Sequence, residues 1–73
     1  MGKGVETYSD GEVWRNRVGG REPLPGTFPS REAAVEAGRA EARIRGVVHV
    51  IRRDDGAVDQ RNRYPRRSDE LPM

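Results

Sequence analysis

Two Asp-Gly pairs stand on either side of an alanine-rich segment, and they constrain the fold of this chain more than any other feature. Asp10-Gly11 and Asp55-Gly56 are strong signals for the tight turn of a β-hairpin. Each pair is flanked by short stretches with the composition or alternation of strands. The sequence therefore predicts two hairpins separated by a helix.

The first hairpin is expected to join strands at Val5 to Tyr8 and Glu12 to Val18. Side chains of a strand point alternately to its two faces. Trp14, Asn16 and Val18 therefore share one face, and we expect Trp14 and Val18 to point inward.

The second hairpin is expected to join strands at Val47 to Arg52 and Val58 to Tyr64. The first of these is rich in valine and isoleucine, which favour strands. The returning strand alternates, and this places side chains on two faces. One face has Val58, Gln60, Asn62 and Tyr64, and the other has Asp59, Arg61 and Arg63.

A helix is predicted from Ser30 to Arg45. The Ser30 hydroxyl suits the N-cap, and Gly46 is a typical C-terminal stop. Apolar residues recur at helical spacing and predict a mostly alanine face toward the sheet. The residues of this predicted face are Ala33, Ala37, Ala40 and Ile44.

The predicted order is β-β-α-β-β, which gives an α+β fold. The simplest packing is one antiparallel sheet with the helix on one face. The domain is expected to span residues 5–65, between a disordered N-terminus at 1–4 and a disordered tail at 66–73.

Length and composition predict a thin core. The chain has 73 residues, of which 33% are hydrophobic and 36% are charged, and its net charge is +2. Such a small domain buries little apolar surface, so support from a homodimer partner or another protein is expected. The chain has no cysteine, no apolar signal segment and no stretch long enough to span a membrane. We therefore expect a cytoplasmic protein without membrane attachment.

Several of these residues together are similar to a known family. The quoted pattern is Val13-Trp14, the run from Phe28 to Ala33, the Val47-Val48-His49 strand, the stretch from Asp55 to Val58, and Tyr64. It resembles a family of small bacterial proteins, the domain of unknown function 2188, over roughly residues 5 to 66. Its members usually carry an aliphatic residue two positions after the tryptophan, where this chain has Asn16. The resemblance implies the ββαββ fold and no function.

No catalytic or cofactor-binding arrangement is visible, so we do not expect an enzyme. His49 is the only histidine, and no nucleophile or orienting partner stands at a recognisable spacing from it. Asp54, Asp55 and Asp59 lack the remaining ligands of a calcium loop, and turn chemistry accounts for the first two. The glycines form no phosphate-binding loop. No cofactor, metal or small-molecule substrate is expected.

Arginine is the one residue type whose distribution suggests a function. Lys3 is the only lysine among the 14 basic residues. The guanidinium group is suited to phosphate and carboxylate, although the codon usage of a GC-rich genome would also enrich arginine. The arginines of the second hairpin and the tail, with a tyrosine among them, are candidate contacts for nucleic acid or another anion. These candidates are Arg52, Arg53, Arg61, Arg63, Tyr64, Arg66 and Arg67.

Two functions therefore remain open. The first is a non-enzymatic module for protein interaction or self-association, through the open face of the sheet or through an edge strand. The second is a nucleic-acid-binding accessory protein that uses the arginine-rich hairpin.

Overall fold

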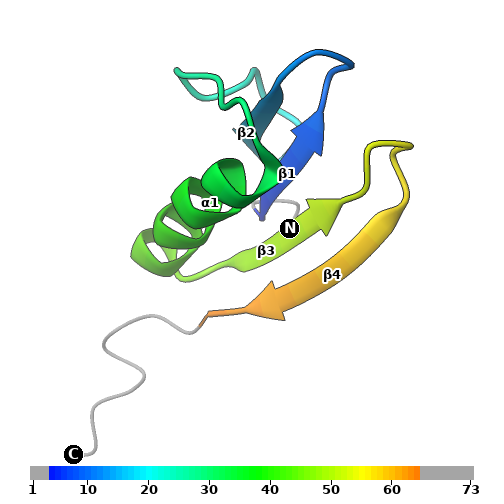
Figure 1. Cartoon of the computed structure of the whole chain (residues 1–73). Helices are drawn as coiled ribbons and strands as arrows, with labels where there is room; N and C mark the ends of the chain where they lie inside the picture. The colour runs from blue at the N-terminus through cyan, green and yellow to red at the C-terminus, as the bar shows by residue number, and fades with distance from the viewer. Residues whose placement is uncertain (1–3, 65–73) are drawn as a thin grey trace, which may run out of the picture.

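The computed structural model describes residues 4–64 (Figure 1). The residues predicted to be disordered, apart from Gly4, lie outside this range. The order β-β-α-β-β is confirmed, and one helix packs on one face of a four-stranded sheet. The elements are β1 (Val5–Ser9), β2 (Trp14–Val18), α1 (Arg31–Arg45), β3 (Val48–Arg52) and β4 (Val58–Arg63).

Both predicted hairpins form, although their loops are longer than two residues. The Asp10 carboxylate accepts hydrogen bonds from the backbone N–H groups of Glu12 and Val13, which fixes the first turn. In the second turn Gly56 has a φ of 93°, a conformation that residues with a Cβ rarely adopt. Asp-Gly thus supplies both a side-chain acceptor and the required backbone freedom.

The sheet is mixed, so the prediction that all its strands pair antiparallel was wrong. Its strand order is β2-β1-β3-β4, and the central pair, β1 and β3, is parallel. Both hairpin pairs are antiparallel as expected.

The segment between β2 and α1 explains the parallel pair. It runs back alongside β2, with the backbone groups of Phe28 and Trp14 exchanging two hydrogen bonds of 2.9 Å. The chain has therefore already reversed direction before the helix begins. The helix reverses it once more, so that β3 runs in the direction of β1.

The helix has the predicted caps. The Ser30 hydroxyl accepts a hydrogen bond from the Ala33 N–H, and Gly46 closes the helix with a φ of 68°. The predicted buried face was wrong, because Ile44 is 81% exposed. The residues that face the sheet are Ala34, Gly38 and Ala42.

Small residues at the contact let the helix lie close to the sheet, which is why the larger Ile44 is excluded from it. An apolar cluster of Val5, Val18 and Ala42 lies at one end of this interface. Polar side chains fill its middle, where Thr7, Asn16 and His49 are all buried. Within residues 4–64, no helix has the length and apolarity that crossing a bilayer would require.

Candidate functional site

The structure places the tyrosine of the predicted cluster and the arginines of β4 on opposite sides of the sheet. Arg61 and Arg63 pair with Val50 and Val48 of β3, so their side chains leave the sheet on the face away from the helix. Tyr64 lies on the helix side instead, with its ring 5.4 Å from the guanidinium carbon of Arg43. The structure therefore separates the tyrosine from these two arginines.

The other predicted arginines either contact groups of the protein itself or lie outside the described residues. Arg52 donates hydrogen bonds to the Glu6 carboxylate and to the Gly56 carbonyl. Arg53 lies in the hairpin loop, 3.8 Å from Asp59. Arg66 and Arg67 lie outside the described residues.

The face of the sheet away from the helix carries most of the arginines of the strands, and we call it the open face. Strand alternation and register assign its residues. They are Glu6 and Tyr8 of β1, Arg15 and Arg17 of β2, Val48, Val50 and Arg52 of β3, and Arg61 and Arg63 of β4.

Glu6 is the carboxylate of this face, and two arginines hold it. Arg17 donates to one of its oxygens at 2.6 Å, and Arg52 donates to the other at 3.1 Å. Partial burial alone would raise the pKa of Glu6, but the hydrogen bonds from Arg17 and Arg52 outweigh it and the pKa lies below its usual value. Glu6 is therefore ionised at neutral pH and balances only part of the charge around it.

Arg61 and Arg63 supply the remaining positive charge. Both side chains are exposed, and no described carboxylate lies within ion-pair distance of either. Exposed guanidinium groups of this kind can bind phosphate or carboxylate without first breaking an ion pair to a described carboxylate.

An aromatic side chain lies on the same face. The Tyr8 ring is 4.8 Å from the guanidinium carbon of Arg17, in a stacked cation–π arrangement. Tyr8 and Arg17 were not among the sequence-predicted contacts. The signal that could have found them is the pairing register of β1 with β2, together with the strand alternation that places Tyr8 on the same face as Glu6.

A hollow of about 340 Å³ opens on this face beside Arg61. Its floor is formed by Val48 and Val50, and its wall by glycines at positions 4, 19 and 20. A Cβ on Gly4 would lie 2.6 Å from Cγ1 of Val48, so this part of the wall has to be bare backbone. A ligand can approach the main chain closely here.

His49, considered in the sequence as a catalytic candidate, lies on the helix side in a sealed polar layer. Its Nε2 is 2.7 Å from the Thr7 hydroxyl, which itself donates to Oδ1 of Asn16 at 2.5 Å. Thr7 and His49 are fully buried. A threonine beside a histidine resembles a nucleophile and its base, but in this layer neither side chain reaches the surface.

The hydrogen bonds of this layer fix the protonation of the imidazole. The Asn16 amide donates to the Ala34 carbonyl, which orients its oxygen toward Thr7. The single Thr7 proton goes to that oxygen, so Thr7 must accept from a protonated Nε2 of His49. The other nitrogen, Nδ1, has no partner among the described residues. Burial, and then the charge of Arg39, lower the pKa of His49, so the ring is neutral at neutral pH.

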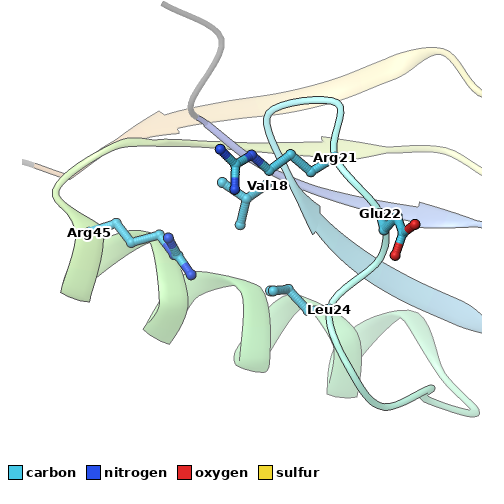
Figure 2. Close-up of a pocket in the computed structure, with 5 residues that line it drawn as sticks. All are labelled: Val18, Arg21, Glu22, Leu24 and Arg45. Carbon is cyan, nitrogen blue, oxygen red and sulfur yellow. The ribbon is translucent and has the colours of Figure 1, made fainter.

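A second hollow, of about 540 Å³, lies between the loop after β2 and the end of α1 (Figure 2). Val18 and Leu24 form its apolar floor, and the guanidinium groups of Arg21 and Arg45 lie beside them. Figure 2 shows the Glu22 carboxylate turned away from the floor. Arg45 is already bonded to Glu41 at 2.8 Å, so the charge here is partly balanced.

The aspartates considered for a cation site have other contacts. Asp55 accepts a hydrogen bond from the Ala57 N–H, which is ordinary turn chemistry. Asp59 pairs with Arg31 of the helix and faces Arg53.

The two edges of the sheet differ. The outer edge of β2 is covered by the segment that contains Leu24 and Phe28, whose N–H groups donate to Asn16 and Trp14. In the part of the chain that the structure describes, no strand pairs with the outer edge of β4. Every β4 residue is exposed except Asn62, which is half-buried.

Comparison with known proteins identifies a family and adds no activity. A family model described as an uncharacterised protein conserved in bacteria, DUF2188, matches residues 5–64. The chain therefore belongs to this family. No curated protein and no solved structure matches it.

Proposed function

For this member of an uncharacterised bacterial family, we propose a non-catalytic, cytoplasmic interaction module that pairs through the outer edge of β4. The partner is a strand of a second copy of the chain. The observation that carries this proposal is the difference between the two edges of the sheet. An uncovered strand edge presents unpaired N–H and C=O groups, and such an edge pairs readily with another strand.

The exposure of β4 supports the same conclusion. The helix packs against β1, β2 and β3, and Figure 1 shows β4 at the margin of the sheet. With both of its faces exposed, β4 gains little from apolar burial within one chain. Pairing with a second strand would supply stability that the single chain lacks.

The charges of β4 are compatible with self-pairing. The strand carries Asp59 as well as arginines. An antiparallel pairing centred on Gln60 would place Asp59 of each copy, which also pairs with Arg31 of its own helix, opposite Arg61 of the other. Opposite charges across a strand pair favour its register by a few tenths of a kcal/mol.

Sedimentation equilibrium of the full chain over a range of concentrations tests this proposal, together with amide hydrogen exchange. We expect a reversible monomer–dimer equilibrium, and β4 amides whose protection rises with concentration. A strict monomer at millimolar concentration, or protection that rises elsewhere and not in β4, would overturn it.

Two exposed apolar residues provide a matched pair of variants. Val58, in β4, is 42% exposed, and Ile44, on the outer side of the helix, is 81% exposed. In the pairing centred on Gln60, Val58 lies opposite Asn62 of the second copy. Val58→Lys adds a positive charge to a paired strand that already carries Arg61 and Arg63, so dimerisation should weaken. Ile44→Lys makes the same change away from β4 and should leave dimerisation unchanged. The reverse pattern would place the interface on the helix.

Nucleic-acid binding by the arginine-rich hairpin is the second candidate. It is supported by Arg61 and Arg63, which are exposed on one face without a described carboxylate partner. Binding of this kind should weaken steeply as salt rises. The test is fluorescence anisotropy with labelled DNA and RNA at low salt, using Arg61→Ala/Arg63→Ala as the variant. No binding at low salt, or no effect of the variant, would exclude it.

A further inference from the structure

We infer that the open face is a binding platform for single-stranded nucleic acid, with Tyr8 and Arg17 as the stacking site for a base. This inference rests on the second proposed function and specifies its ligand and its site. Its basis is the coincidence on one face of a tyrosine ring with a guanidinium over it, two exposed arginines without a described carboxylate partner, and a hollow lined in part by glycine.

The proposed stacking site is the ring of Tyr8 together with the guanidinium group of Arg17. A half-buried tyrosine on an open sheet offers a flat apolar surface, and the guanidinium of Arg17 already stacks on it at 4.8 Å. Bases of single strands stack on aromatic rings and on guanidinium planes, because every base has a π face. The bases of a duplex are already stacked on one another and cannot use such a site.

The proposed phosphate contacts are Arg61 and Arg63. Arg61 and Arg63 leave β4 on the same face as Tyr8, with β3 between them and β1. A strand whose base stacks at Tyr8 can cross β3 and place its phosphates near these two arginines. Glu6 lies along this path, but Arg17 and Arg52 hold its carboxylate.

The hollow beside Arg61 lies on the same face, next to Glu6. Its floor of Val48 and Val50 is apolar, and the three glycines of its wall leave the backbone uncovered. A sugar or a base can therefore settle against the sheet without displacing a side chain. A protein partner that presents a like-charged copy of this face would be repelled, whereas a polyanion is attracted.

Anisotropy measurements with fluorescein-labelled single-stranded and duplex oligonucleotides of equal length test the inference. We expect tighter binding of the single strand. Tyr8→Ala should weaken it by roughly 5- to 150-fold, the range for loss of one stacked base. Tyr8→Phe keeps the ring and should restore binding. Arg61→Ala/Arg63→Ala should reduce the slope of log affinity against log salt by about 1.4.

The matched control is Arg43→Ala/Arg45→Ala, which removes the same charge from the helix side. It should change binding much less than the β4 pair does. Tighter binding of the duplex, or no effect of Tyr8→Ala, would overturn this inference while leaving the second proposed function intact. An equal loss with both arginine pairs would show attraction by net charge alone and would also overturn it. No binding of either nucleic acid would exclude both.

Discussion

Gly38 lies so close to His49 that a Cβ built on the glycine would be 2.6 Å from Nε2 of the imidazole. The same Cβ would be 2.6 Å from the Thr7 hydroxyl and from Oδ1 of Asn16. Gly38 therefore covers the polar layer on the helix side, and the close approach of helix and sheet depends on this glycine.

Replacing this glycine should destabilise the protein although alanine favours helix. The Gly38→Ala change gains about 1 kcal/mol of helix propensity. Against this, the three side chains that the new methyl would meet are fixed by hydrogen bonds, and overpacking of this kind costs about 1–3 kcal/mol or more. We expect a net loss of stability in urea unfolding. An increase of about 1 kcal/mol in the free energy of unfolding would show that the three side chains shift to accommodate the methyl group at little cost.

The Thr7 hydroxyl is the centre of the polar layer, and its removal should cost more than its size suggests. Thr7→Val preserves the shape but leaves the Nε2 proton of His49 and Oδ1 of Asn16 without their partner. Each unsatisfied buried group costs about 1–3 kcal/mol. The loss in urea unfolding should be smaller when Asn16→Leu is already present. Strict additivity of the two changes would contradict a shared network.

His49 should make stability depend on pH below neutrality. Its pKa is lowered in the folded protein, by burial first and then by Arg39. Between the two pKa values, His49 binds a proton in the unfolded chain but not in the folded chain. The free energy of unfolding is therefore greatest above the unfolded pKa of about 6.5. It should fall as pH drops from there toward the folded pKa.

Chemical unfolding at a series of pH values measures this effect. The groups that face the ring are Thr7 and Asn16 from the sheet and Arg39 from the helix, and none of them titrates between pH 5 and 7. His49→Gln should flatten the profile in that range. A wild-type profile that is already flat there would show that the buried ring accepts a proton without cost.

The two tyrosines should have opposite roles. Tyr64 packs against the apolar cluster of Val5, Val18 and Ala42, so Tyr64→Ala should lower stability by about 1–3 kcal/mol. Tyr8 lies on the open face, and Tyr8→Ala should affect stability less and nucleic-acid binding more. Thermal unfolding and anisotropy on the same two variants separate these effects. Loss of binding in the Tyr64 variant at a temperature where it is folded would reverse the assignment.

The elements could be predicted from the sequence because their signals are local. Ser30 and Gly46 cap the helix through bonds within one turn, and Asp-Gly determines each hairpin within a few residues. The parallel pairing could not be predicted, because it depends on the reversal made by the segment from 19 to 30. That reversal shows in the bonds that join Phe28 to Trp14 and Leu24 to Asn16, which no local pattern predicts.

The buried face of the helix was mispredicted for a related reason. Apolar periodicity selected the face that contains Ile44, whereas close approach required the face that contains Gly38. Glycine carries no hydrophobic signal, so a pattern of apolar residues does not detect it. Asn16 was similarly inconspicuous, since its partners Thr7 and Ala34 are distant in sequence.

For the candidate site, the sequence indicated the arginines and not their arrangement. Arg61 and Arg63 share a face by strand alternation alone, and the structure agrees. Tyr8 was missed because its nearness to β3 arises from the central parallel pair. The pairing of β1 with β3, which are distant in sequence, is what brings Tyr8 into the same surface as Arg61 and Arg63.

The strip of chain that covers β2 has a further consequence for how many molecules can assemble. With Leu24 and Phe28 bonded along that side, residues 4–64 leave one edge for strand addition, at β4. A building block with one such point has a valency of one. If two copies join there as proposed, each would occupy the edge of the other, and the assembly would end at a pair instead of growing into a fibre.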